Sequence, residues 1–389
     1  MRYRLLPEDF EVEELICLPR AGRGPYALYQ VRKIGRTTLQ VQAAMARALG
    51  CPRSWVHFPA LKDRRAVAHQ YAAVQGGGPA EVRGKGWSAR RVGWARRPLR
   101  PSDLRGNRFT VVLRDLVPEE VQDIPGRLEA LARHGLPNYF DQQRFGSYIP
   151  GEEWVGKRVL QRDAEGALRA HLGGAMVGDP PEVVAFKAQA DAHWGAWDDL
   201  FQVAPRPSNY RSVLVFLRDH PKDYRRALNL VTPRVLSLYL AAYQSLLWNR
   251  MVGRFLRGRV AAAGRVEIAG ETLPLYAALP EPLLEQWGET FVPLPHHRVS
   301  FADPAWAALF EEVMAEEGLG PADLKARLLR HAYLGPGERA LLLFPQEAVA
   351  LEAAPDERFP GRRRLTIRFA LPRGAYATLV LKALERCQV

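Results

Sequence analysis

The segment "FPALKDRRAVAHQ", residues 58–70, places one carboxylate, that of Asp63, among three cations. Lys62 precedes Asp63, and Arg64 and Arg65 follow it. Neighbouring cations favour the ionised form of a carboxylic acid, so this side chain would be a poor general acid but a usable nucleophile or charge stabiliser. An aspartate that forms a salt bridge in a solvated turn would explain the same residues equally well. The segment alone leaves both interpretations open.

The flanking pattern predicts how Asp63 is positioned. "WVHFPAL" and "AVAHQYAAVQ" are typical of a strand pair, which leaves "KDRR" in the connection between them. "TTLQVQAAMARALG" predicts a helix that is capped by Thr37 or Thr38 and stopped by Gly50. Further strands are expected in "FEVEELI", "YALYQVRKIG" and "RFTVVLRDL", and another helix in "EEVQDIPGRLEALARHG". The first 150 residues therefore mix strands and helices.

The pattern changes beyond residue 150. Residues 151–340 are mostly helical in periodicity, with Pro-rich connections. Strand alternation returns in "RRRLTIRFALP", and a short helix follows in "YATLVLKALERC". Strands, then helices, then strands again suggest one domain interrupted by an inserted one. We expect residues 1–150 and 341–389 to form the split domain and residues 151–340 the insertion.

Composition and charge favour a polyanionic partner. The chain of 389 residues carries a formal net charge of +13, and Arg, which binds phosphate bidentately, supplies most of it. Three scattered cysteines without a CxxC pair argue against a disulfide framework and for a reducing compartment. No apolar run is long enough to span a bilayer. We therefore expect a soluble, cytoplasmic protein.

The densest basic stretch runs from Arg83 to Arg108 and holds nine cations against one acid, Asp103. Trp87 and Trp94 lie within it. Cations fix phosphates and aromatic faces stack on bases, so this stretch predicts nucleic-acid binding, although a solvated charged face would look similar. A second basic stretch, "RFPGRRRLTIRFALPRG", supports the first interpretation. The expected contacts to the backbone of RNA or DNA are Arg83, Lys85, Arg90, Arg91, Arg96 and Arg97.

Several other chemistries lack their motifs. There is no GxxxxGK[ST] phosphate loop, no HExxH, no GxSxG and no Cys/His cluster with metal spacing. The carboxylates of "PEDFEVEE" could suggest a glycosidase pair, but turn and strand-face residues explain them more simply.

Five stretches in this order resemble the TruD family of tRNA pseudouridine synthases. They are "PEDFEVEE", "ALKDRRAVAHQ", "NYFDQQRFG", "AAYQSLLWN" and "FALPRGAYATLVLKAL", and together they span nearly the whole chain. The resemblance implies an α+β fold, with a catalytic domain built on a mixed, largely antiparallel sheet and a mostly helical α/β insertion. It implies isomerisation of uridine to pseudouridine in tRNA, at uridine 13 of the D arm, without cofactor or metal.

The resemblance also implies roles for individual residues. Asp63 matches the catalytic aspartate, and Phe140 of "NYF" matches an aromatic residue that stacks on the target base. The other implied substrate contacts are Arg4 as the basic partner of the aspartate, Lys62, Phe10, Asn138 and Tyr376. Whether the carboxylate attacks the base or the sugar, and which residue removes the C5 proton, stay open.

This chain departs from the family pattern at four positions. Ala60 stands where Gly is usual, Ala68 where Thr is usual, Asp141 where Gly is common and Tyr376 where Phe is usual. These changes bear on the shape of the pocket. Asp63, Lys62 and Gln70 match the pattern, and the expected activity depends on them.

Two alternatives stay beside the leading hypothesis. One is an RNA-binding protein or RNA chaperone on the same fold, and the other is a synthase with further RNA targets. We expect tRNA as the partner, no membrane, no obligate protein partner and a monomer.

Overall fold

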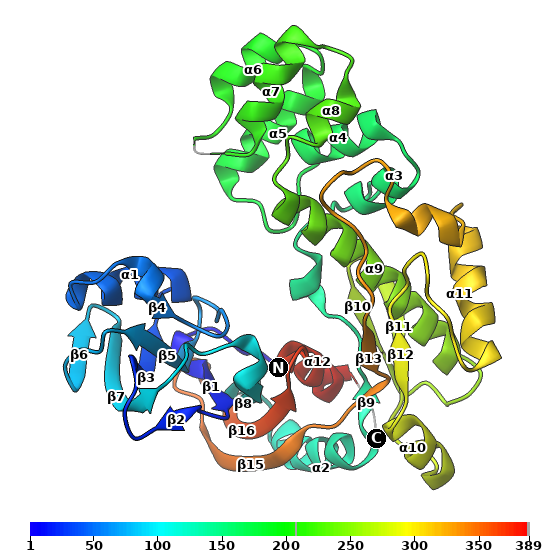
Figure 1. Cartoon of the computed structure of the whole chain (residues 1–389). Helices are drawn as coiled ribbons and strands as arrows, with labels where there is room; N and C mark the ends of the chain where they lie inside the picture. The colour runs from blue at the N-terminus through cyan, green and yellow to red at the C-terminus, as the bar shows by residue number, and fades with distance from the viewer. Residues whose placement is uncertain (207, 387–389) are drawn as a thin grey trace. The chain divides into compact units, whose positions relative to one another are not determined.

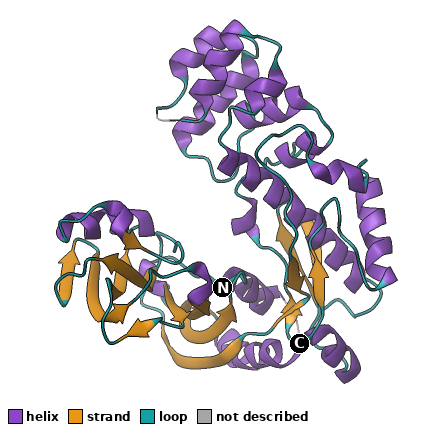
Figure 2. Ribbon diagram, viewed as in Figure 1, coloured by secondary structure: helices purple, strands orange, loops and turns teal. Residues whose placement is uncertain are grey.

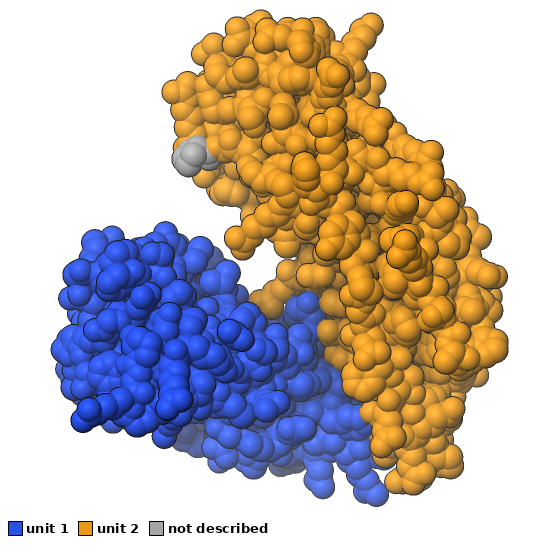
Figure 3. Space-filling view, viewed as in Figure 1, with its two compact units in different colours: residues 1–136, 343–385, 389 blue, residues 137–342, 386–388 orange. Residues whose placement is uncertain are grey.

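The computed structural model describes residues 1–206 and 208–386. The chain divides into two compact units, the first formed by residues 1–136 with 343–385 and the second mainly by residues 137–342 (Figure 3). These divisions differ from the expected domain boundaries after residues 150 and 340. The assignment of residues 151–340 as an inserted domain stays a prediction.

The first unit is built on one large mixed sheet (Figures 1 and 2). Its strands follow the order β15-β16-β8-β1-β5-β3-β7-β2, with β4 paired to β5 and β6 paired to β7. Among the described residues the strands of this sheet pair in antiparallel fashion, except for the parallel pair of β1 with β5. The strands are β1 (Phe10–Ile16), β2 (Arg20–Ala21), β3 (Tyr26–Ile34), β4 (Val56–His57), β5 (Val67–Gln75), β6 (Glu81–Gly84), β7 (Trp87–Ala95), β8 (Leu104–Leu116), β15 (Gln346–Pro355) and β16 (Arg363–Pro372). The expected α+β class with a mixed sheet is confirmed.

Three helices complete this unit: α1 (Thr38–Ala48), α2 (Pro118–His134) and α12 (Ala377–Arg386). Helix α1 packs on one face of the sheet, where Val41 and Met45 join Tyr29, Val31 and Ala72 in a buried core. Helix α2 packs against β15 and β16. Both helices cover apolar strand faces, as amphipathic helices in a layered fold must.

The predicted limits of α1 are confirmed. The Thr37 hydroxyl accepts a hydrogen bond from the Gln40 amide, which satisfies a free donor of the first turn. Gly50 follows the helix with φ +62°, a conformation that favours glycine. The helix therefore begins beside the connection between β4 and β5.

The second unit is mostly helical, as expected. Its helices are α3 (Val155–Leu160), α4 (Ala164–Leu172), α5 (Pro181–Ala192), α6 (Trp197–Val203), α7 (Tyr210–Asp219), α8 (Tyr224–Leu228), α9 (Pro233–Leu256), α10 (Glu281–Gly288) and α11 (Pro304–Glu316). Helix α9 is the central one, because α3 and α11 both pack on it and Tyr243 and Trp248 are fully buried along it. Between the described ends of the chain, no helix is both long and apolar enough to cross a membrane.

Short strand pairs accompany these helices, in keeping with the α/β character expected of this segment, although the sequence analysis did not locate them. They are the hairpin β10 (Gly264–Ile268) with β11 (Glu271–Leu275), and the pair β12 (Phe291–Pro293) with β13 (Glu338–Ala340). At the ends of the segment, β9 (Leu136–Pro137) pairs with β14 (Leu342–Leu343). Hairpin β10–β11 packs on α9.

A buried ion cluster links β8 to residues from both chain segments of the first unit. The Arg114 guanidinium lies 2.8 Å from Asp9 and 3.0 Å from Asp356, and all three side chains are buried. Asp9 precedes β1, whereas Asp356 follows β15. Removal of one partner of a buried ion pair leaves uncompensated charge, so Arg114 should matter far more than an exposed arginine.

We predict that Arg114→Leu lowers the free energy of unfolding by about 3–5 kcal/mol in urea denaturation. Arg2→Leu is the control, because its partner Asp115 and its own side chain are substantially exposed. That control should cost less than about 1 kcal/mol. Equal losses in the two variants would contradict a special role for the cluster.

Candidate active site

The connection between β4 and β5, residues 58–66 and here called the Asp63 loop, is where the sequence predicted it. Its main anchor is Lys62. The Lys62 ammonium lies 3.1 Å from the Glu14 carboxylate on β1 and donates a 2.7 Å hydrogen bond to Asn107 Oδ1 on β8. The Glu14 side chain is fully buried and also accepts a hydrogen bond from the Tyr71 amide. Lys62 is therefore turned into the protein.

Gln70 on β5 and Thr38 at the start of α1 extend this anchor. The side-chain amide of Gln70 donates a hydrogen bond to the backbone carbonyl of Ala60 at 3.1 Å. The Thr38 hydroxyl donates to Gln70 Oε1 and accepts from the Lys62 backbone amide. Both ends of the segment from Ala60 to Lys62 are thus held by buried polar groups.

Lys33 on β3 binds the backbone of the Asp63 loop. Its side chain is fully buried, and its ammonium donates to the carbonyl oxygens of Asp63 at 2.5 Å and Arg36 at 2.9 Å. Burial lowers the pKa of Lys33 from 10.5 to about 8, although the nearby Asp63 charge partly opposes that shift. On the outer side of the loop, Arg64 Nε donates to the Gly35 carbonyl.

The Asp63 carboxylate itself points outward. Its side chain is 48% exposed, against 10% for Lys62, and it forms an ion pair with Arg4 at 3.2 Å. Arg4 has φ +62°, an uncommon conformation for a residue other than glycine. Its guanidinium lies over the Phe10 ring, 3.8 Å from the centroid. A fixed backbone thus presents a reachable anion beside a guanidinium, which suits a nucleophile or a charge stabiliser.

The structure places the other expected residues of the first unit as follows. The Phe10 ring is buried and packs under Arg4 and against Phe109, so it supports the guanidinium rather than forming an open wall. Tyr376 is half-buried in the turn before α12. Glu14 and Asn107 already bind the Lys62 ammonium, so this geometry favours a positioning role for Lys62. Its expected contact with substrate stays a prediction.

Asn138 and Phe140 belong to the second unit. The Asn138 side chain donates to the Ala340 carbonyl and accepts from Arg339 at 2.7 Å. The Arg339 guanidinium lies 4.2 Å from the Phe140 ring centroid, and Trp248 contacts the ring edge-on at 5.6 Å. Asn249 holds the Phe140 backbone through two hydrogen bonds. Stacking of a base on the Arg339 side of this ring would therefore require Arg339 to move.

The basic stretch folds into β6, β7 and the start of β8. Arg97 is not available for RNA as expected, because it forms a bidentate pair with Asp103 at 2.6 and 2.8 Å. Arg91 donates to the Gly78 carbonyl, and Arg83 pairs with Glu81. The expected cations that are exposed and have no carboxylate partner among the described residues are Lys85, Arg90 and Arg96. Trp87 lies in the core, so it is not a stacking platform.

Sequence reasoning missed Glu14 and Lys33 as site residues. A signal for Glu14 existed, because it shares a strand face with Phe10 and Val12, which are buried. A carboxylate on an apolar strand face requires a buried partner. Among residues 1–206 and 208–386 no group of three metal-ligating side chains is found.

The fold defines the class of protein. A solved crystal structure from Methanosarcina mazei, assigned as tRNA pseudouridine synthase D (TruD), matches with a TM-score of 0.77. The match covers 98% of this chain and 92% of that one at 22% identity. The chain therefore has the TruD fold.

The sequence comparisons identify the family. Residues 1–271 match the family profile described as tRNA pseudouridine synthase D (TruD). The tRNA pseudouridine synthase D of Geobacter sulfurreducens is 31% identical, with 98% of this chain and 92% of that protein covered. The corresponding protein of Aquifex aeolicus is 25% identical, with 99% and 98% covered. The chain belongs to the TruD family.

Lys33 gives a testable pH dependence. Burial makes the folded protein release this proton near pH 8, whereas the unfolded chain releases it near 10.5. Between those values the unfolded state holds more protons, so the contribution of Lys33 to the free energy of unfolding rises with pH. We predict that wild type gains about 2–3 kcal/mol over Lys33→Met when urea denaturation at pH 7 is compared with pH 10. A pH-independent difference would contradict the burial of this ammonium.

Proposed function

We propose that this protein isomerises uridine to pseudouridine in tRNA, with uridine 13 of the D arm as the target. Family membership supports the reaction class. The observation that carries the role of Asp63 is the contrast between its backbone carbonyl, which the buried Lys33 ammonium binds, and its half-exposed carboxylate. Such an arrangement holds a reactive group in place while leaving it reachable.

The residue types fit the chemistry. The N-glycosidic bond breaks, the uracil turns, and C5 bonds to C1′ and then loses its proton, which returns to the nitrogen released from the sugar. Atoms and electrons balance within the nucleotide, so the overall reaction consumes no co-substrate. Asp63 attacks the ring or the sugar, or stabilises positive charge that develops on the sugar. Arg4 fixes the direction of the carboxylate through its ion pair.

Substrate binding requires the uridine to leave its stack, which costs a few kcal/mol. Phe140 is proposed to stack on the flipped base, with Arg339 moving if the base occupies its side of the ring. Asn138 and Tyr376 are further proposed substrate contacts, and Phe10 is proposed to act through Arg4, whose guanidinium lies on its ring. Contacts to the RNA backbone offset part of the cost. The protein is proposed to act as a monomer without a protein partner.

Two alternatives are separable by one assay. A transcript labelled with tritium at C5 of uridine releases tritium when pseudouridine forms, because C5 loses its proton. Release from a tRNA transcript by purified protein contradicts a pure RNA-binding or chaperone function. Continued release after uridine 13 is replaced by cytidine would reveal further RNA targets.

We predict that Asp63→Asn reduces single-turnover tritium release by about 10⁴-fold or more, because the amide lacks the charge of the carboxylate. RNA affinity and the thermal midpoint should stay close to wild type, since the loop is held through other groups. Asp123→Asn, the same change at an exposed position on α2, is the control and should keep full activity. A folded Asp63→Asn protein within about tenfold of the wild-type rate would remove Asp63 from catalysis.

A further inference from the structure

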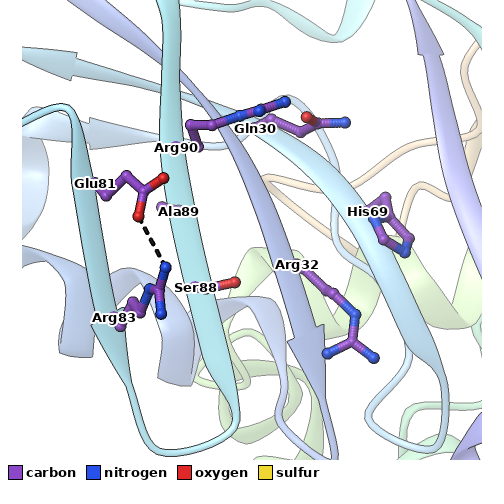
Figure 4. A pocket seen from close by; sticks show the side chains of 8 residues that line it. All are labelled: Gln30, Arg32, His69, Glu81, Arg83, Ser88, Ala89 and Arg90. Carbon is purple, nitrogen blue, oxygen red and sulfur yellow. Dashed lines mark hydrogen bonds and ion pairs between the residues drawn. The ribbon is translucent and has the colours of Figure 1, made fainter.

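The sheet of the first unit has a polar face that turns away from α1. Register places Arg83 of β6, Ser88 of β7, Arg32 of β3 and His69 of β5 directly opposite one another across neighbouring strands. Residues paired in this way point to the same face of a sheet. Figure 4 shows their side chains together on that face.

These side chains line an open concavity of about 470 Å³. The lining residues are Gln30, Arg32, His69, Glu81, Arg83, Ser88, Ala89 and Arg90. None of them is Phe, Tyr or Trp, and the one apolar member is an alanine. An apolar ligand would find little surface here, whereas a ligand recognised by charge and hydrogen bonds would find several donors.

The charge of this concavity is not balanced internally. Glu81 pairs with Arg83 at 2.9 Å, and His69 lies 2.7 Å from Glu11. Arg32 and Arg90 are exposed, and neither forms an ion pair within residues 1–206 and 208–386. They are diagonal neighbours, since Arg90 lies two residues beyond Ser88, the residue opposite Arg32. Diagonal neighbours are about 7–8 Å apart, so the two arginines without an ion pair lie near one another on the same face of the sheet.

We propose that Arg32 and Arg90, with Ser88 and Gln30, bind phosphate groups of the RNA backbone in this concavity. The inference rests on the proposed function and names a contact surface for its substrate. The planar guanidinium matches phosphate oxygens bidentately, and the hydroxyl and amide supply further donors. An RNA backbone presents the regular row of anions that an open, positively charged sheet face can hold.

This surface overlaps only in part with the one predicted from the basic stretch, since it keeps Arg90 and adds Arg32. Arg91 and Arg97 of that stretch are engaged within the protein, whereas Arg32 lies in a strand outside it. The neighbouring carboxylates of β1 are already occupied, because Glu13 pairs with Arg108 and Glu11 with His69. The uncompensated charge is therefore concentrated at β3 and β7.

The test compares two charge-matched double variants of the full chain, Arg32→Ala with Arg90→Ala and Arg47→Ala with Arg133→Ala. Arg47 on α1 and Arg133 on α2 are exposed and have no ion-pair partner among the described residues. Affinity for an unmodified tRNA transcript is measured as salt is varied. In a plot of the logarithm of the association constant against the logarithm of salt concentration, the first variant should reduce the magnitude of the negative slope by about two, because two phosphate contacts are lost. The control should change the slope by less than half a unit, on the order of a weak long-range effect.

The control variant should keep the single-turnover rate within about twofold of wild type, whereas the first variant should need more transcript to reach its maximal rate, since the concavity contributes affinity rather than chemistry. An unchanged slope in the first variant, or an equal change in both, would overturn the proposal. A third outcome separates the two proposals. If the wild-type protein releases no tritium while the Arg32/Arg90 variant still loses RNA affinity, the proposed function is contradicted and this binding surface is supported.

Discussion

The buried ion pair between Glu14 and Lys62 is the interaction on which the candidate active site depends. Glu14 lies on the face of β1 that also carries Phe10 and Val12, so its carboxylate is removed from water. An isolated charge there would be very costly, and Lys62 provides the compensating one. Because Lys62 is drawn inward, its neighbour Asp63 is left with its carboxylate 48% exposed. One electrostatic requirement thus sets the direction of both side chains.

The surrounding groups make this arrangement specific rather than merely stable. Buried ion pairs contribute little net stability, since desolvation offsets the attraction. Here the pair is joined to Asn107, Gln70 and Thr38 through hydrogen bonds, and Lys33 binds the Asp63 carbonyl. These groups come from four strands and one helix that are far apart in sequence. The fold of the first unit therefore acts as a scaffold that places a short loop in one conformation.

Local patterns predicted much of this scaffold. Thr37 and Gly50 marked the ends of α1. Period-two alternation located β1, β3 and β5, and the strand patterns on either side of "KDRR" placed the Asp63 loop in a connection. Strand β15 was missed because it is a largely exposed edge strand without a clear apolar alternation. Hairpin β10–β11 was missed because it is short and lies within a helical segment.

The chemical environment was less accessible from the sequence. The folded conformation decides that Lys62 meets Glu14 and that Arg97 meets Asp103, and register across strands decides that Arg32 stands opposite Ser88. Such pairings are tertiary, so counting charges along the chain could not separate engaged cations from available ones. Burial is similarly a property of the fold, and it turns Lys33 from an ordinary strand residue into a support with a pKa of about 8.

The most direct measurement combines unfolding and single-turnover kinetics for Glu14→Met, Lys62→Met and the double variant. Each single change strands a buried charge and should cost about 3–5 kcal/mol, whereas the double change removes both charges and should restore most of that stability. We expect the restored double variant to bind RNA normally but to form pseudouridine more than about tenfold slower, because Asp63 has lost its anchor. A stable double variant with the wild-type rate would contradict the account, since the ion pair would then not position Asp63.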